Sequence, residues 1–266
     1  TERMRITSAG QITINNADAY GNLTIKSSST FNTSDAPGST TLYLSSQGTV
    51  GENNYGASIG FTKINSLLRP GAAIGVVQTS ADEDQCGLAF FTHNVATTGN
   101  TMYEAMRLGH AGTLTINAAA STPPIVFNQG PSEVARIDSS GRMLVGTSSA
   151  RTVDVSSTTM IPQLQLEGLS AAASSFSIIR NEAGSSQPYL VLGKSRSGSL
   201  SGATAVVTND ALGAILFEGT DGTAMVEAAS VNAEVDGTVA SGVMPGRLIF
   251  STTASGASSP SERFRI

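Results

Sequence analysis

The chain has little of what globular enzymes ordinarily use to build a core. Tryptophan is absent, and aromatic residues make up 5% and charged residues 13% of its 266 residues. Small side chains bury little apolar area each, so burial must come from many thin layers or from neighbouring chains rather than from one deep core. Heptad repeats are also missing, which excludes a coiled-coil shaft as the main architecture.

Three further absences narrow the class of protein. Cys86 is the only cysteine, which excludes an intrachain disulfide framework. The net charge of -5 comes without a basic patch, so we expect no nucleic-acid partner. No apolar run reaches membrane-spanning length, so we expect no membrane insertion. The chain begins without Met and ends inside a repeated motif, and we expect it to be a segment of a longer polypeptide.

What the chain does contain is a short motif that recurs. Each complete copy has Glu, then Arg three residues later, then Ile or Leu, and then Gly eight residues after the Glu. A fixed internal spacing is the signature of a repeat architecture. The motif residues are Glu2, Arg5, Ile6 and Gly10; Glu104, Arg107, Leu108 and Gly112; Glu133, Arg136, Ile137 and Gly141; and, at the end of the chain, Glu262, Arg265 and Ile266.

The motif predicts a strand, a tight turn and a second strand. In the first copy Met4 and Ile6 alternate before the Gly, and Ile12 and Ile14 alternate after it, which is the period of a strand with one buried face. Each Arg has the opposite parity and should point away from that face or to an edge. The Gly should supply a positive φ in the turn. We expect the Glu and Arg to form an ion pair across neighbouring strands or chains rather than a catalytic pair.

Unequal distances between the motifs suggest four parts. Residues 1–103 hold the first motif and a β module, and residues 104–132 form a short shaft or linker unit. Residues 133–261 hold the third motif and a second, related β module, and residues 262–266 start a truncated fourth motif. We therefore expect motif-built shaft segments to alternate with small β modules.

The two long parts contain matching short strands. Strands predicted at residues 23–25, 42–44, 59–61 and 87–92 match those predicted at residues 164–166, 190–192, 215–217 and 246–251. Further strands are predicted at residues 74–77 and 125–127, and a sustained helical period is missing. Many short strands between turn signals predict an all-β fold, a repetitive fibre of short strands.

The motif strands are too small to be stable alone. An apolar stripe of two residues, at about 25 cal/mol per Å2, offsets only a few kcal/mol, whereas ordering costs about 1–2 kcal/mol per residue. Three copies around an axis would bury Met4, Ile6, Ile12 and Ile14 against their symmetry mates. We therefore expect an intertwined parallel homotrimer.

No set of residues predicts catalysis, a cofactor or a metal site. The consecutive carboxylates at residues 82–84 lie on one loop, whereas a glycosidase needs two carboxylates held across a cleft. His93 and His110 lie in polar turns without metal-ligand spacing. Tyr55, beside Asn53, either contacts a sugar or packs in the β module. We expect no enzymatic activity and no cofactor.

The run from Gly246 to Ile266 resembles the repeats of tailed-bacteriophage fibre and appendage proteins, those of marine phages above all, in which an E-R-M-R-I segment and its turn recur along the shaft. The second motif departs from that pattern at Ala105 and at Gly109. The resemblance implies a homotrimeric β-structured fibre on a virion, assembled in the host cytoplasm. Other virion fibre or tail proteins would be its partners, and a host surface glycan or protein its target. Two alternatives stay open, a bacterial surface adhesin or filament and a polysaccharide-degrading tailspike.

Overall fold

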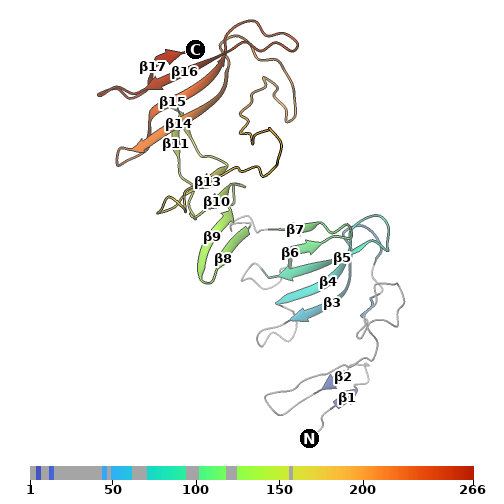
Figure 1. Ribbon diagram of the computed structural model, residues 1–266. Coiled ribbons are helices and arrows are strands. Elements are labelled where there is room, and N and C mark those ends of the chain that lie inside the picture. Colours follow the sequence, from blue (N-terminus) through green and yellow to red (C-terminus); the bar gives the residue numbers. More distant parts are fainter. Residues whose placement is uncertain are drawn as a thin grey trace. The chain divides into compact units, whose positions relative to one another are not determined.

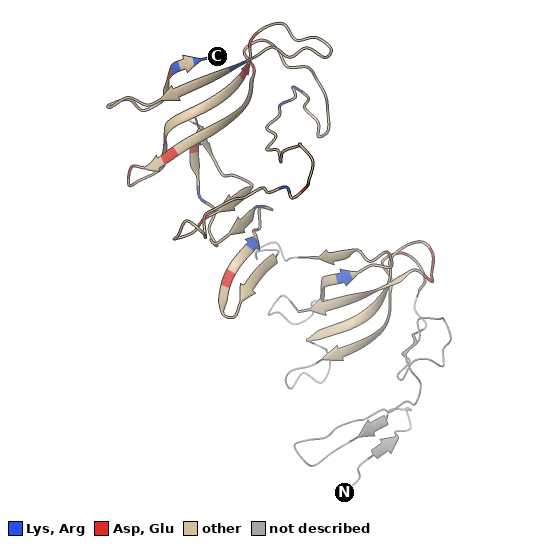
Figure 2. Cartoon of the chain, in the orientation of Figure 1, with Lys and Arg blue, Asp and Glu red and all other residues tan. Residues whose placement is uncertain are grey.

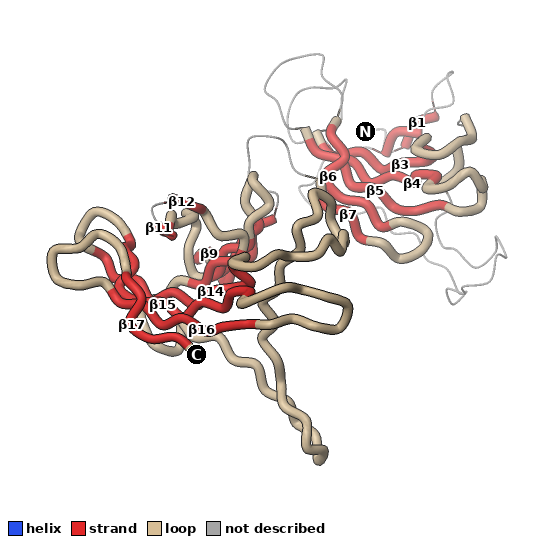
Figure 3. Tube along the Cα trace, turned by 90° about the horizontal axis from the view of Figure 1, so that it is seen from above, coloured by secondary structure: helices blue, strands red, loops and turns tan. Residues whose placement is uncertain are grey.

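The described part of the chain consists of strands and loops. The structure is a computed structural model that describes residues 44–46, 49–61, 71–93, 102–117, 125–155 and 158–266, and the backbone alone of residues 4–6 and 12–14. Figure 1 and Figure 3 show strands joined by loops, and no helix occurs within these ranges. The fold is all-β, as the sequence predicted. The chain divides into two units, Thr1–Asn117 and Ala118–Ile266.

The first unit contains a hairpin and a five-stranded sheet. The hairpin pairs β1 (Met4–Ile6) with β2 (Ile12–Ile14). The sheet is antiparallel, and its strands lie side by side in chain order, so that every connection joins neighbours. These strands are β3 (Tyr55–Phe61), β4 (Ala72–Gln78), β5 (Cys86–Thr92), β6 (Tyr103–Leu108) and β7 (Leu114–Ile116).

The second unit contains two four-stranded sheets and a hairpin. The strands of the first sheet are β8 (Ile125–Gln129), β9 (Ser132–Ile137), β10 (Met143–Val145) and β13 (Leu164–Leu166), in the order β13-β10-β9-β8. The hairpin pairs β11 (Val153–Val155) with β12 (Thr158–Met160). The last sheet is an antiparallel meander of β14 (Ala211–Thr220), β15 (Met225–Val235), β16 (Gly246–Thr252) and β17 (Ser261–Arg265).

The sheets cross the boundaries expected from the sequence. The expected boundary between residues 103 and 104 falls inside β6, which pairs with β5. The expected short unit, residues 104–132, is shared between two sheets, because β6 and β7 complete the first sheet and β8 begins the next. The fourth motif, in β17, is likewise the last strand of the β14–β17 sheet. Three motif strands, β6, β9 and β17, therefore pair with the strand before them and belong to the same sheet as that strand.

The strands β3–β6 and β14–β17 form two copies of the same meander. Both begin at a corner where an asparagine has positive φ, 66° at Asn53 and 70° at Asn209, a conformation that Asn adopts more readily than most residues. The Asn53 amide donates to the Gln78 carbonyl and the Asn209 amide to the Val235 carbonyl, each at 2.8 Å. The predicted match between residues 59–61 and 215–217 agrees with this alignment.

The predicted match between residues 87–92 and 246–251 is one residue out of register. Leu88 lies opposite Leu108 of the second motif. Leu248 exchanges two hydrogen bonds with Ile266 of the fourth motif, at 3.0 and 2.9 Å. Leu88 therefore corresponds to Leu248 and not to Arg247, with which the predicted match aligned it. A shift by one residue moves every side chain to the other face of a sheet, so only the observed pairing identifies which residues share a face.

For the other two matched pairs of predicted strands, the structure describes mainly the members in the second unit. Residues 164–166 form β13, whereas residues 190–192 form no strand. Their predicted counterparts, residues 23–25 and 42–43, lie outside the described residues, and Leu44 is not in a strand.

The turn after the motif strand has the geometry predicted for its glycine. The Gly109 amide donates to the Thr113 carbonyl and the Gly112 amide to the Gly109 carbonyl, both at 2.9 Å. The turn that contains Gly141 has the same two hydrogen bonds, each at 3.0 Å. The two glycines have φ of 78° and 77°, as in a three-residue hairpin loop that ends in the left-handed region. Gly10 lies outside the described residues.

Replacing Gly141 with Ala is expected to lower the free energy of unfolding by about 1–2 kcal/mol, because an L-residue is strained at positive φ. Space is not the cause, since no atom lies within 4 Å of the added Cβ. Gly219→Ala is the matched control, because Gly219 is equally open but lies in a strand without positive φ. It should change stability by less than about 0.5 kcal/mol. Urea unfolding measures the free energy of unfolding of both variants. Equal losses of stability in the two would contradict the role of the positive φ at Gly141.

Candidate functional site

Each motif strand that is paired with the strand before it carries one extra residue at the same place. In β6 the register shifts opposite Phe90 and Phe91, because Ala105 has no residue opposite it. Val134 in β9 and Arg263 in β17 are the extra residues of the other two copies. An extra residue in one strand of an antiparallel pair is a β-bulge, which bends the strand and redirects its side chains.

The bulge places the Glu and Arg of the motif on one face. In a regular strand, residues three apart point to opposite faces, and one extra residue brings them to the same face. In the second, third and fourth motifs the Arg donates two parallel hydrogen bonds to the Glu carboxylate, which is the strongest geometry for this pair. The pairs are Arg107–Glu104 at 2.8 and 2.7 Å, Arg136–Glu133 at 2.5 and 2.5 Å, and Arg265–Glu262 at 2.7 and 2.5 Å. The ion pair thus lies within one strand, and the expectation of a pair across strands or chains is corrected.

In the first motif the structure places Arg5 and Ile6 in β1. Arg5 lies opposite Thr13, in the same register that Arg107 has with Thr115. Glu2 and Gly10 lie outside the described residues. The backbone pairing of the first copy thus matches that of the second.

In the first sheet the motif pair is part of the corner where β3 begins. Glu104 also accepts a hydrogen bond from the Tyr55 hydroxyl at 2.9 Å, and Arg107 donates to the side-chain oxygen of Asn53 at 2.7 Å. The Tyr55 ring packs edge-on against Phe91, with ring centroids 5.0 Å apart. The side chains of Arg107 and Glu104 are only 18% and 12% exposed. Tyr55 and Asn53, considered above as a sugar contact, therefore hold this corner together.

These contacts fix the charge states of the groups at the corner. Partial burial acts to raise the pKa of Glu104, but hydrogen bonds from Arg107 and Tyr55 and the guanidinium charge outweigh burial and lower it. Burial, with the hydrogen bond to Glu104, raises the pKa of Tyr55. The hydrogen bond to Glu104 also raises the pKa of Arg107. A carboxylate held ionised by an arginine is a poor general acid near neutral pH.

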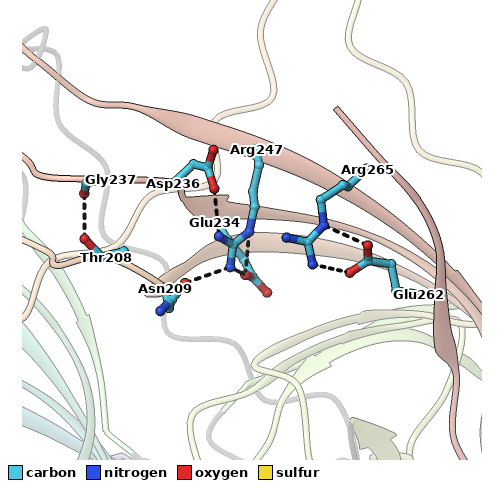
Figure 4. A network of polar contacts seen from close by, with 8 residues as sticks. All are labelled: Thr208, Asn209, Glu234, Asp236, Gly237, Arg247, Glu262 and Arg265. Carbon is cyan, nitrogen blue, oxygen red and sulfur yellow. Dashed lines mark hydrogen bonds and ion pairs between the residues drawn. The ribbon is translucent and has the colours of Figure 1, made fainter.

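In the last sheet an arginine from another strand holds the corner (Figure 4). Arg247 of β16 donates to the side chain of Asn209 at 2.9 Å, to Glu234 at 2.6 Å and to Asp236 at 2.8 Å. The motif arginine of β17, Arg265, then contacts its own Glu beside this network and is 52% exposed. The same corner is thus stabilised by the motif arginine in one sheet and by a neighbouring strand in the other.

The face opposite the ion pairs is apolar in all three sheets. Residues that are paired across neighbouring strands point to the same face. The central rows of this apolar face are Ile59, Ile74, Phe90, Met106 and Ile116 in the first sheet; Ile125, Ile137, Met143 and Leu164 in the β8–β13 sheet; and Ile215, Val231, Phe250 and Phe264 in the last sheet. Figure 2 shows how few charged residues the strands carry.

Much of this apolar face is exposed in the described chain. Leu108 and Ile266, which occupy the same motif position, are 46% and 72% exposed. Phe61 and Phe217, equivalent residues of β3 and β14, are 51% and 56% exposed. Large contiguous apolar patches are uncommon on monomeric proteins and mark interaction surfaces.

The ion-paired face, in contrast, is closed within the chain. Val77, Ala89 and Leu144 on this face are fully buried, and Ala73 and Ile249 are 5% and 8% exposed. In each of these sheets, therefore, apolar side chains on the ion-paired face are buried within a single chain, whereas large apolar side chains on the opposite face remain exposed.

Two glutamates lie opposite each other across β14 and β15. Glu218 pairs with Glu227, which is 7% exposed. The Oε2 atom of Glu227 is buried and has no hydrogen-bond partner among the described residues. Burial raises the pKa of Glu218, and the charges of Glu227 and of Asp154 in β11 add to that effect. Like charges placed directly opposite destabilise a sheet.

Replacing Glu218 with Gln is expected to raise the unfolding temperature at about pH 8 and to change it little at about pH 4. A raised pKa in the folded state gives stability that is present at low pH and is lost as the pH rises through the folded pKa. Relief of the like-charge contact should be worth on the order of 0.5 kcal/mol. Thermal unfolding at several pH values measures it.

Asp221→Asn is the control variant, and we expect it to change the unfolding temperature in the opposite direction from Glu218→Gln. Hydrogen bonds from the Thr223 hydroxyl and from the backbone amides of Ala224 and Thr223 lower the pKa of Asp221 to about 2. A lowered pKa gives stability that is present above the unfolded pKa, so this variant should unfold at a lower temperature at about pH 8. Identical pH profiles for the two variants would contradict both assignments.

The other polar residues considered in the sequence lie in turns. Residues 82–84 connect β4 to β5 and are exposed, and the Asp82 carboxylate accepts a hydrogen bond from the Asp84 amide at 3.1 Å. The His110 ring nitrogen Nδ1 lies 2.8 Å from the Thr79 hydroxyl. Among the described residues, no three or more His, Cys, Asp or Glu side chains gather as metal ligands would. The part of the chain that is described has no helix that could cross a membrane.

Two solved structures resemble this chain loosely, whereas no protein-family model and no curated protein matches it. One is the carboxy-terminal domain of the bacteriophage T5 L-shaped tail fibre, with 14% identity and a TM-score of 0.35 over 89% of this chain and 87% of that one. The other is the same domain with its intramolecular chaperone, with 13% identity and a TM-score of 0.36 over 96% of this chain and 60% of that one. Such low TM-scores do not establish a shared fold, so we base the functional inference on the motifs and the sheets.

Proposed function

We propose that this chain is a structural segment of a bacteriophage fibre or appendage, built by association of identical copies. The fibre would project from the virion, join other fibre or tail proteins and contribute to host attachment through a surface glycan or protein. The repeated motif, with its resemblance to phage fibre repeats, supports the biological setting. The exposed apolar face carries the inference of self-association.

Three sheets present this face in the same way. In each of them the motif strand places its Glu–Arg pair on the closed face and its apolar residues on the open one, so that the motif itself builds the surface. In the last sheet five large side chains on that face are between 43% and 72% exposed: Ile215, Phe217, Leu248, Phe264 and Ile266. Because the motif builds this apolar surface in three sheets, a cover must offer a matching apolar surface to each of them.

A second copy of the chain supplies such a cover. In the first sheet the paired positions of the open face carry no charged side chain, so identical faces can meet there without burying a charge. In the last sheet the bulge residue Arg263 donates to the hydroxyl of Thr252 on this face at 2.8 Å. A half-exposed Leu, Ile or Phe gains about 1 kcal/mol when it is covered, and association costs about 4–15 kcal/mol. One sheet scarcely offsets that cost, whereas three sheets per chain do. Three copies around an axis would bury the faces of all three chains together.

We assign the chain no enzymatic activity. The motif carboxylates Glu104, Glu133 and Glu262 are each held by an arginine, and an occupied carboxylate is not free to act as nucleophile or base. The adhesin and tailspike alternatives gain no support from a specific feature of the described residues.

Sedimentation equilibrium of the purified segment tests the proposal. We expect a species of three chains, each of 27.1 kDa, that persists on dilution. A folded monomer whose mass does not change with concentration would refute it.

A further inference from the structure

The chain between β13 and β14 contains an apolar stretch without a strand partner. Residues 167–210 form no strand, and Figure 1 shows them as a yellow-to-orange trace without arrowheads. Within them we define the donor segment as residues 188–192. Its three central residues, Tyr189, Leu190 and Val191, are 63%, 68% and 81% exposed. Because consecutive residues of an extended chain point to opposite sides, the donor segment is uncovered on both sides.

The backbone of the donor segment is also unpaired. No backbone hydrogen bond joins residues 188–192 to another described residue. Tyr and Val are residues that favour strands, and Pro188 stands where a strand tolerates proline, at its first position. The sequence of the donor segment is thus that of a strand, and what it lacks is a neighbouring strand.

The last sheet has a free edge that fits such a strand. β14 is its outermost strand, with β15 on one side and no strand of the described residues on the other. It is 10 residues long and contains neither Lys nor Pro, the residues that usually protect an open edge. Ile215 and Phe217 on β14 are 50% and 56% exposed. A long apolar edge of this kind invites the addition of a strand.

The donor segment ends close to this edge but does not lie along it. Leu192 packs against Gly213 of β14, where an added Cβ would lie 2.7 Å from the Leu192 Cβ. Beyond it, Arg196 binds Asp210 with hydrogen bonds of 2.6 and 2.8 Å, which fixes the chain just before β14. In the first unit Ser46 reaches the same corner, 3.7 Å from the position of an added Cβ at Gly56.

We propose that the donor segment of one chain adds as a strand to the free edge of β14 in a second copy of this chain. The proposal rests on the proposed function, because it requires that copies assemble. Each chain has one donor segment and one β14 edge, so every copy can both give a strand and receive one. A head-to-tail exchange of this kind closes into a ring, as a trimer does, and fills the β14 edge of every copy.

Disulfide trapping tests the exchange. Cys86→Ser removes the only cysteine, and chains with Val191→Cys are then refolded together with chains that carry Ile215→Cys or Phe217→Cys. A disulfide requires Cα atoms about 4.4–6.8 Å apart, so only chains paired at this edge cross-link. We expect at least one β14 position to give several-fold more linked dimer than Val243→Cys, which is similarly exposed at 54% but lies in a turn.

Cross-linking no greater than in the Val243 control, in a preparation that still sediments as an oligomer, overturns the strand exchange and leaves the proposed function standing. A preparation that sediments as a folded monomer overturns both. Linkage only within a single chain that carries both cysteines shows that the segment fills its own edge, which also overturns the exchange.

Hydrogen exchange on the unaltered chain gives an independent measurement. We expect the amides of residues 189–192 to exchange on the order of 100-fold more slowly than that of Leu200, which is 99% exposed in a turn. Equal rates in the assembled protein would contradict a strand at this position.

Discussion

Replacing Leu108 with Asp is expected to dissociate the assembly while the sheet of the single chain stays folded. Leu108 is 46% exposed in the single chain, so the carboxylate would keep its water there. In an assembly that covers the apolar face, three unpaired carboxylates would be buried close together, at a cost of at least several kcal/mol. Sedimentation should show a loss of the trimer, and far-ultraviolet circular dichroism should show that the strands remain.

The matched control is Asp82→Ala. Asp82 lies in the exposed turn between β4 and β5 and is not one of the paired positions of the apolar face. It should leave the mass and the stability of the assembly unchanged. Ile137→Asp, at the equivalent motif position of the β8–β13 sheet, should resemble Leu108→Asp rather than the control. If Leu108→Asp sediments like the unaltered protein, the apolar face is not the contact between copies.

Replacing Arg107 with Met should destabilise the first unit by about 2–3 kcal/mol, because it leaves Glu104 partly buried without its guanidinium and removes the donor to Asn53. Arg265→Met is the matched comparison, since the same bidentate contact is made by a side chain that is 52% exposed. An exposed ion pair contributes about 0–1 kcal/mol, so this variant should lose less.

Chemical unfolding of the two arginine variants measures the difference in the free energy of unfolding. The ordering follows from burial alone, because the two pairs have the same chemistry and the same spacing. Equal losses would mean that the corner contacts of Tyr55 and Asn53 do not depend on the ion pair.

Two different spacings occur in the motif, and the prediction used only one of them. Glu and Arg recur three residues apart in every copy, whereas the apolar residues alternate by two. Two residues three apart share a face of a strand only if one extra residue lies between them, so an ion pair within the strand at this spacing requires a bulge. The alternation alone led to the expectation of a pair across strands. The pairing of Glu104 with Phe91 and of Met106 with Phe90 shows the extra residue directly.

The longest strand, β15, was not predicted from the sequence. Met225–Val235 contains Ala and Ser beside Glu227, Asn232 and Glu234, a composition that does not favour a strand by itself. It forms because β14 and β16 flank it on both sides and satisfy its backbone. Residues 190–192 show the reverse, since their composition favours a strand and the single chain offers no neighbour.

The sequence by itself determined the local features of this protein: most of its short strands, the turn of the motif, the glycine at positive φ, and the apolar and charged sides of the motif strand. These follow from side-chain period and backbone sterics within a few residues. Only the tertiary structure decided the register between strands, the sheet to which each motif belongs, and the fact that much of the apolar face stays exposed in the three larger sheets. Those depend on pairing between distant residues, where a shift of one position exchanges the two faces and no local preference opposes it.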